Sequence, residues 1–251
     1  PHSDLATVRD QDLRQHGCKC RRMDVRGPFR DAWPPGWHVE HVAETASTNA
    51  DLIERGVSAP ARTVLFADHQ TAGRGRLDRR WDAPPGTNLL VSLLFQGGSP
   101  IELMRRVAIA AVTAVAPSRI GAAGVDARLK WPNDILVEDR KLAGMLAQRA
   151  GDTIVIGLGV NVGWAPEGAA RLGDGVTPAG VLTHLLAAFD ELATQSSEAV
   201  HARYRELLST LGQQVRVELA GGELVGRAID VQPSGELVVL DECAVSHRID
   251  V

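Results

Sequence analysis

The spacing of apolar and polar side chains changes twice along the chain and divides it into three parts. Residues 1–36 are mostly polar, which predicts an extension with at most one helix, around residues 10–16. Residues 37–212 show the periods of strands and helices. Residues 213–251 keep only short alternating segments between glycine-rich turns, which predicts a small β-barrel domain. Its four predicted strands are 215–219, 224–230, 236–240 and 245–251.

The strands and helices of the middle part come in mixed groups rather than in strict alternation. This order favours the α+β class, with a mixed, largely antiparallel sheet and helices packed against it. The predicted strands are 38–43, 63–68, 88–95, 127–131, 134–138, 141–148 and 153–162, and the predicted helices with their caps are 45–55, 99–116, 177–193 and 196–212.

The helix over 99–116 carries two local signals. Ser99 and Glu102 form a capping-box pattern at its start. Its apolar residues recur at the spacing that buries one face of a helix. These residues are Ile101, Met104, Ala108, Ala111, Val112 and Val115.

Composition and charge then narrow the class of protein. The chain is 44% hydrophobic, yet no apolar run approaches the roughly 20 residues that cross a bilayer, so no membrane association is expected. A net charge of −4 disfavours recruitment of nucleic acid by overall charge. Three cysteines cannot form a disulfide framework and no secretory signal is visible, so a cytoplasmic location is expected. Cys18 and Cys20 with His16 lack a second ligand pair, and no metal ligands are assigned.

A charged loop joins two apolar strands at residues 68–81. Gly73 and Gly75 let the backbone approach a ligand closely, and guanidinium groups offer paired donors to carboxylate or phosphate. By itself the loop is equally compatible with a solvated basic segment. An RNA-binding run is disfavoured because no aromatic or basic pattern continues beyond Trp81. The four arginines of the loop are Arg74, Arg76, Arg79 and Arg80.

Two lysine-containing segments follow. Lys130 to Asp134 reads Lys-Trp-Pro-Asn-Asp, a sequence suited to a turn between strands. Lys141 opens a buried strand that has Gly144 beyond it. An exposed turn lysine and a lysine that snorkels from a strand end are the alternative interpretations.

Together, five segments resemble the biotin protein ligase family over residues 38–165, and the small C-terminal β domain matches too. The resemblance implies a class II synthetase-like catalytic domain followed by an SH3-like β-barrel. It also implies an ATP-dependent ligase that converts biotin to biotinyl-5′-AMP and pyrophosphate, using Mg²⁺. The biotin would then pass to a lysine ε-amino group of a biotin carboxyl carrier protein, such as that of acetyl-CoA carboxylase. The five segments are Ser47–Asn49, Gln70–Trp81, Lys130–Asp134, Lys141–Gly144 and Gly157–Asn161.

The resemblance also implies residue roles. Catalytic roles fall on Arg76, Lys141, Lys130 and Asp134, with Asp134 as a proton acceptor for the incoming amine. ATP or adenylate binding falls on Arg79, Trp81, Asn161 and Trp164, although both tryptophans could simply be core residues. The segment 74–86 is expected to act as a lid. Biotin binding falls on Ser47, Thr48, Asn49, Gln70, Gly73, Arg74, Arg76 and Gly144.

This sequence departs from the family where Asp78 replaces a glycine, which weakens the assignment of Arg79. Some relatives carry an N-terminal helix-turn-helix, but residues 1–36 are too few for one, so no DNA binding is predicted. A lipoate ligase or octanoyl transferase is the enzymatic rival, and a catalytically inactive biotin-binding module is the other. The acceptor carboxylase and the choice between monomer and weak homodimer stay open.

Overall fold

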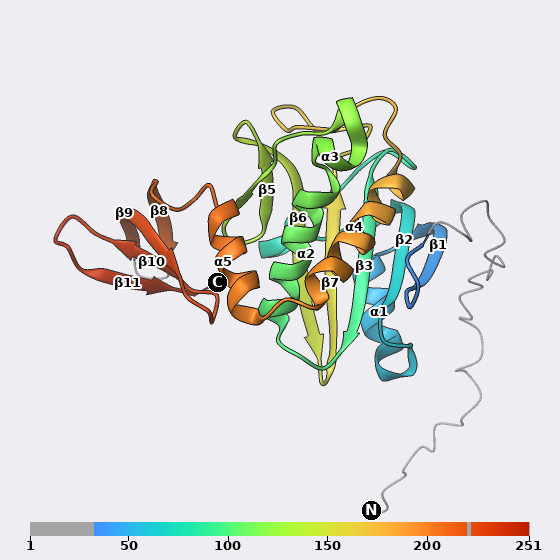
Figure 1. The fold of residues 1–251 in the computed structure, drawn as a ribbon, viewed down its shortest axis with the longest axis horizontal. Helices are drawn as coiled ribbons and strands as arrows, with labels where there is room; N and C mark the ends of the chain where they lie inside the picture. Colours follow the sequence, from blue (N-terminus) through green and yellow to red (C-terminus); the bar gives the residue numbers. More distant parts are fainter. Residues whose placement is uncertain (1–32, 220–221, 251) are drawn as a thin grey trace, which may run out of the picture.

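The computed structural model describes residues 33–219 and 222–250, and these form two β-sheets with helices on the larger one (Figure 1). The larger sheet has seven strands in the order β1-β2-β3-β7-β6-β5-β4. Strand β1 is parallel to β2, and every other neighbouring pair is antiparallel. The strands are β1 His38–Thr45, β2 Thr63–Gln70, β3 Leu89–Gln96, β4 Arg128–Lys130, β5 Asp134–Val137, β6 Arg140–Ala150 and β7 Thr153–Val160.

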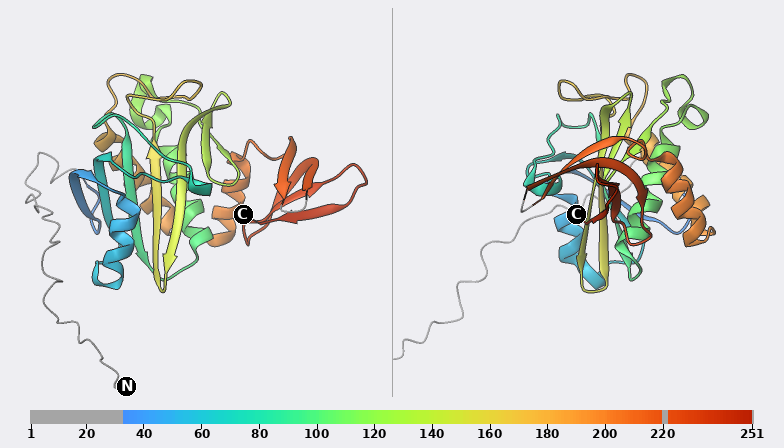
Figure 2. Two further views of the ribbon diagram at one scale, coloured as in Figure 1. Left: turned by 180° about the vertical axis from the view of Figure 1, so that it is seen from behind. Right: turned by 90° about the vertical axis from the view of Figure 1, so that its left-hand side faces the viewer.

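The helices cover both faces of this sheet. Helices α2 and α4 lie on one face, and α1 lies on the other, as the edge-on view in Figure 2 shows. The helices are α1 Thr48–Arg55, α2 Pro100–Ala114, α3 Pro117–Ile120, α4 Pro178–Ala193 and α5 Ser197–Leu207, with short 3₁₀ turns η1 Gly56–Ser58, η2 Arg76–Asp78 and η3 Gly121–Ala123.

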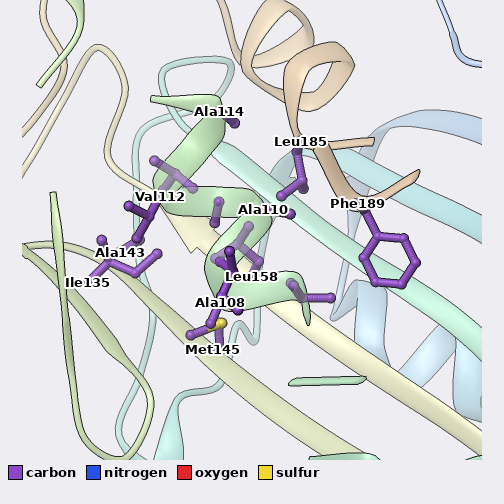
Figure 3. Close-up of a cluster of buried hydrophobic side chains, with 14 of the residues drawn as sticks. Ala108, Ala110, Val112, Ala114, Ile135, Ala143, Met145, Leu158, Leu185 and Phe189 are labelled. Atoms are coloured by element: carbon purple, nitrogen blue, oxygen red, sulfur yellow. The ribbon is translucent and has the colours of Figure 1, made fainter. Parts of the chain in front are cut away.

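Helix α2 is buried on more sides than its sequence spacing predicts. Ala108 and Val112 are buried as expected, but so are Ile109, Ala110 and Ala114. Figure 3 shows the reason, because residues from the sheet lie on one side of α2 and residues from α4 on the other. A helix held between a sheet and a second helix has no fully solvated face, so its core positions exceed one stripe.

The second sheet lies beyond the β4 edge of the first (Figure 1). Its order is β11-β10-β9-β8, all antiparallel. Its own small core contains Ala228, Leu237, Val239 and Ile249. The predicted α+β class, with a mixed, largely antiparallel sheet, is confirmed. The C-terminal part, predicted as a small β-barrel, is a separate small domain whose described strands form an antiparallel sheet. The strands are β8 Gln214–Leu219, β9 Gly222–Val231, β10 Leu237–Leu240 and β11 Ser246–Ile249.

The turn between β9 and β10 joins the two sheets. Trp131 Nε1 donates to Gly235 O at 3.0 Å. The buried Arg105, from α2, donates to Pro233 O at 2.8 Å and to Gln232 O at 2.6 Å. The C-terminal sheet is therefore attached directly to the segment that follows β4.

Several predicted boundaries are wrong. The last helix was expected to reach residue 212, but α5 ends at Leu207. Leu208 is extended and forms a parallel bridge with Leu129, so a tertiary contact ends the helix. The capping box forms only in part: Ser99 Oγ accepts from Glu102 N at 3.4 Å, while the Glu102 carboxylate bonds Arg106 at 2.9 Å.

Other predictions concern residues that the structure does not describe or boundaries that it does not test. Residues 1–32 of the predicted extension lie outside the described residues. This part includes His16, Cys18 and Cys20. The domain boundaries at 36 and 212 stay predictions, and β8 begins at Gln214. Within 33–219 and 222–250, no single helix has the length and apolar character to cross a membrane, whereas the bent pair Pro100–Ala114 with Pro117–Ala123 meets that criterion when taken together.

Candidate active site

A cavity of ≈ 420 Å³ lies on the sheet face that α1 covers. Strands β3, β6 and β7 supply its floor, and the segment after β2 crosses over it, as the teal trace in the left view of Figure 2 shows. The turn from β4 to β5 closes a further side. The cavity brings together all but two of the residues that the sequence singled out. These are Ser47, Thr48, Asn49, Gln70, Arg74, Arg76, Arg79, Trp81, Lys130, Asp134, Lys141, Gly144 and Asn161.

The start of α1 provides polar, uncharged side chains of the cavity wall. Ser47 is the N-cap, and its hydroxyl accepts from Ala50 N at 3.5 Å. Thr48 donates to Gln70 Oε1 from its backbone nitrogen at 2.8 Å. An N-terminal helix turn leaves backbone N–H groups without helical partners, and here one of them orients Gln70 at the end of β2.

Asn49 lines the cavity, but its amide is already engaged. Its Nδ2 donates to Leu146 O at 3.2 Å and to Gln148 Oε1 at 2.9 Å, and its Oδ1 accepts from Ser92 Oγ at 2.5 Å. A Cβ at Gly157 would lie 2.3 Å from Asn49 Oδ1, so only glycine fits beside this amide. Asn49 therefore shapes the wall rather than offering free polar atoms.

The arginine loop folds back on itself as a tight ribbon. Trp81 N donates to Gly73 O at 3.0 Å, and Gly75 N donates to Arg79 O at 2.6 Å. A Cβ at Gly73 would lie 2.4 Å from Trp81 O, so the close approach of the two chain segments requires glycine. Leu77, at the tip, has φ of 56° and is 73% exposed. The ribbon holds Arg74, Arg76, Arg79 and Arg80 along the cavity.

Trp81 lies on a floor made of glycines. A Cβ at Gly159 would be 2.4 Å from Trp81 Cε2, and one at Gly144 would be 3.2 Å from Trp81 Cζ3. Lys141 Nζ lies 5.5 Å from the centroid of the indole ring, within cation–π range. Glycine at both positions is what admits the indole to the cavity.

Two buried donors at the cavity have no hydrogen-bond partner among the described residues. They are Arg76 Nη1 and Trp81 Nε1. An unpaired buried donor is costly, so such groups in native proteins commonly await a ligand. The chemistry of these donors suits anionic oxygen atoms, for which arginine is well matched.

Lys130, Asp134 and Lys141 meet at one side of the cavity. Lys130 and Asp134 are directly paired across β4 and β5. Lys141 Nζ lies 2.7 Å from Asp134 Oδ1, and both side chains are partly exposed. The peptide bond between Trp131 and Pro132 in this turn is cis. Lys130 and Lys141 thus line the same cavity rather than lying at unrelated places on the surface.

Three of the predicted residues stand differently from the expectation. Gly73 and Trp164 do not line the cavity, although Gly73 lies against Gln70 and Trp81, which do. Asn161 lines it but is 3% exposed, and its Nδ2 donates to Ala170 O and Lys141 O at 3.0 and 3.3 Å. Its oxygen accepts from Asn88 Nδ2 at 3.3 Å.

Sequence reasoning missed several residues of the site. Ser92 is fully buried beneath the cavity and bonds both Thr48 and Asn49. Its only signal was a hydroxyl at an otherwise apolar position of a buried strand. Met145 and Leu158 border the cavity, although their side chains pack in the core beneath α2 (Figure 3), and Pro166 and Ala169 line it from the segment after β7. Within the described ranges, no group of three His, Cys, Asp or Glu side chains could hold a metal ion.

Comparisons with known proteins show which family the chain is similar to. Residues 43–161 match the Biotin/lipoate A/B protein ligase family, and residues 210–243 match the Biotin protein ligase C terminal domain. The first match covers both biotin and lipoate enzymes, whereas the second is specific to biotin protein ligases.

Individual proteins are similar over most of the chain. A biotin–[acetyl-CoA-carboxylase] ligase from Mycobacterium tuberculosis is 37% identical over 221 residues, covering 80% of this chain and 83% of the relative. The bifunctional ligase/repressor BirA of Bacillus subtilis is 27% identical, covering 79% and 67%. A biotin protein ligase from Aquifex aeolicus, solved with biotin and ATP, superposes with a TM-score of 0.72 at 24% identity, covering 84% of this chain and 95% of that one.

The resemblance inferred from the five sequence segments is therefore confirmed. The two matched regions together reach from the first strand of the large sheet into the C-terminal sheet. The lipoate alternative is not favoured, because the C-terminal match and the relative at 37% identity both belong to biotin enzymes. The chain belongs to the biotin protein ligase branch of the biotin/lipoate A/B protein ligase family.

Proposed function

We propose that the protein joins biotin to ATP, forming biotinyl-5′-AMP and pyrophosphate, and then transfers biotin to a lysine of a biotin carboxyl carrier protein. The carrying observation is that one cavity is lined both by uncharged polar side chains, Thr48 and Gln70, and by cationic side chains, Arg76 and Lys141. Biotin has an uncharged ureido ring and a carboxylate at opposite ends. A cavity that offers both kinds of group supports binding with the carboxylate among the cations.

In the first step a biotin carboxylate oxygen attacks the α-phosphorus of ATP and pyrophosphate leaves. Both reactants are anions, so they approach each other only where fixed cations lower their repulsion. Arg76, Arg79 and Lys141 are proposed as that clamp, with Arg74 adding charge. Support comes from the buried, unpartnered Arg76 Nη1 and from the position of Lys141 over the same floor.

In the second step the lysine nitrogen of the acceptor attacks the biotinyl carbonyl, a C–N bond forms and AMP leaves. The amine must lose a proton, for which Asp134 is the proposed acceptor. The ion pair with Lys141 at 2.7 Å supports this role by holding the carboxylate in place. Lys130, directly across the strand pair, is proposed to stabilise negative charge on the carbonyl or phosphate oxygen.

The nucleotide is proposed to lie against the indole of Trp81, whose ring rests on the Gly144 and Gly159 floor. Asn161 is proposed to support this wall from below, since its amide bonds are made to protein atoms. Trp164, which is off the cavity, is the weakest member of the predicted nucleotide set. Mg²⁺ is proposed to enter with the phosphates of ATP, and closure of the segment 74–86 to exclude water from the anhydride.

The acceptor, location and assembly are proposals of the same kind. A biotin carboxyl carrier domain of acetyl-CoA carboxylase is the proposed acceptor, by analogy with the relative of that name. A cytoplasmic site of action is also proposed, and a monomer or weak homodimer is expected. The absence of DNA binding stays a prediction, and a biotin-dependent gel shift with an operator fragment would contradict it.

The test is intact-mass analysis of a carrier domain incubated with the protein, biotin, ATP and Mg²⁺. The mass should rise by one biotinyl group only when biotin and ATP are both present. Substituting lipoate for biotin separates the lipoate alternative, because that enzyme would modify the carrier with lipoate instead. Biotin binding without pyrophosphate release would support the inactive-module alternative and refute the proposal.

A further inference from the structure

A chain of hydrogen bonds runs from the cavity into the sheet beneath the first turn of α1. Ser92 Oγ, fully buried on β3, lies 2.7 Å from Thr48 Oγ1 and 2.5 Å from Asn49 Oδ1. Asn49 Nδ2 continues the chain to Leu146 O and Gln148 Oε1. Thr48 and Asn49 are 3% and 6% exposed, so these bonds are made out of reach of bulk water.

The backbone fixes the direction of this chain at its inner end. The Leu146 carbonyl can only accept, so the atom of Asn49 that faces it is the amide nitrogen, and the oxygen faces Ser92. An amide oxygen only accepts, so the Ser92 hydroxyl gives its single proton to Asn49. Ser92 has no proton left for Thr48, and in their 2.7 Å bond Thr48 is the donor.

A second backbone group fixes the outer end. The Thr48 N–H can only donate, so the Gln70 atom 2.8 Å away is the oxygen, and Gln70 Nε2 points elsewhere. Nε2 makes no hydrogen bond to the described residues, and Gln70 lines the cavity. Thr48 Oγ1 also lies 3.0 Å from Gln70 Oε1. Both acceptors within reach of the Thr48 proton are protein atoms, so its oxygen is left to accept from a ligand.

We propose that Ser92, held by Asn49, is a positioning residue that fixes Thr48 as an acceptor beside Gln70 as a donor. This inference rests on the proposed function and deepens it. The complementary ligand group is an N–H next to a carbonyl, which is the chemistry of a cyclic urea. A dithiolane ring or an alkyl chain offers neither group. The relay therefore makes this polar part of the cavity wall selective for the biotin head over the lipoate or octanoate tail.

Ser92 determines how much free energy is lost if the Thr48 hydroxyl donates to a ligand instead of accepting from it. If Thr48 donated its proton to a ligand, Ser92 Oγ would lose the 2.7 Å bond at a site without water. Without the Ser92 hydroxyl, reversal would forfeit only the longer 3.0 Å bond to Gln70 Oε1, which keeps the Thr48 N–H. Removal of Ser92 should therefore relax the choice between donor and acceptor ligands.

The experiment measures three dissociation constants for the full chain by calorimetry: one for biotin, and one for each of the two cyclic carbamates in which one ring N–H is replaced by oxygen. The discrimination ratio is the dissociation constant of the more weakly bound carbamate, as chosen with the wild type, divided by the dissociation constant of biotin. That ratio is expected to be about tenfold to hundredfold for the wild type. Ser92→Ala should lower it by roughly fivefold or more, because Thr48 can then donate to the ring oxygen.

A double-mutant cycle separates positioning from simple destabilisation. Thr48→Val removes the hydroxyl and should bring the ratio close to one, and adding Ser92→Ala to it should change nothing further. The matched control is Thr153→Val, which removes a buried β7 hydroxyl bonded to Gln96 Oε1 at 3.3 Å outside the cavity. Its ratio should equal that of the wild type.

Each result decides between the two proposals. If Ser92→Ala weakens biotin and carbamate equally, or adds to the effect of Thr48→Val, the relay is refuted while biotin binding stands. If the wild type binds biotin and the carbamates equally well, only the relay is refuted. If it does not bind biotin, the proposed function falls as well. Should Ser92→Ala not fold, Thr48→Ser must keep the ratio that Thr48→Val loses, and the opposite result overturns the inference.

Discussion

Lys141→Ala should separate adenylation from biotin binding. Lys141 Nζ lies 2.7 Å from Asp134 and 5.5 Å from the indole centroid of Trp81, on the side of the cavity proposed for the reacting phosphate. Biotin alone brings one negative charge, whereas the adenylation transition state gathers the carboxylate and the phosphates. The removed charge is therefore missed most in the transition state.

The magnitude follows from Coulomb attraction at contact distance. One charge pair at about 4 Å contributes about 4 kcal/mol at an effective dielectric constant of about 20. Lys141 has a side chain 41% exposed, so solvent screening halves this to roughly 2 kcal/mol. Adenylation should accordingly slow by about 30-fold. Loss of the ion pair also leaves the Asp134 carboxylate uncompensated near the phosphate, which acts in the same direction.

Single-turnover pyrophosphate release measures adenylation, and calorimetry measures the dissociation constant of biotin. Lys141→Arg keeps the charge and serves as the matched variant, with a smaller loss expected because its planar head has a different shape. Equal losses of biotin affinity and adenylation rate in Lys141→Ala would refute the reasoning, since they would mean that the charge acts on the ground state.

Three further outcomes are expected. Gly159→Ala would place a methyl group 2.4 Å from Cε2 of Trp81, so the indole must move and pyrophosphate release should slow by up to about 100-fold; an unchanged rate would contradict the glycine-floor interpretation. Burial raises the pKa of Tyr204 to about 12. Its contribution to stability, roughly 3 kcal/mol, is fully present below pH of about 10 and is lost as pH rises through about 12. Because it is the single tyrosine, tyrosinate absorbance in the native and urea-unfolded protein reports it alone. Arg105→Met removes two bonds to the β9–β10 turn, including that to Pro233 O, and should lower the unfolding free energy by about 2–4 kcal/mol in urea titration.

Much of the sheet could be predicted because strands such as β3 and β7 are nearly continuous apolar runs, and turn residues separate the strands clearly. The helices α1, α2 and α4 could be predicted because their caps and the spacing of their apolar residues are also local signals in the sequence. The end of α5 could not be predicted, because Leu208 leaves the helix to pair with Leu129, which is 79 positions earlier in the chain. Local preference carries no information about such a contact.

The residues of the site also differ in whether local sequence could reveal their role. Motif residues with charge or glycine were found, and thirteen of the fifteen predicted residues line the cavity. What the sequence could not reveal was which polar atoms are already bonded. Asn49 and Asn161 looked like ligand contacts, yet their amides are engaged with protein atoms, and Ser92 looked like an ordinary strand residue. Only the three-dimensional pairing of donors and acceptors distinguishes these cases.

Trp131 belongs to both hydrophobic cores. Its side chain packs against the large core and against the small core of the C-terminal sheet, as does Leu211, and its indole bonds the turn at Gly235. If either core unfolds, apolar side chains of the other core therefore become exposed to water. The two sheets should melt as one cooperative unit, with calorimetric and van't Hoff enthalpies that agree, rather than as two independent transitions.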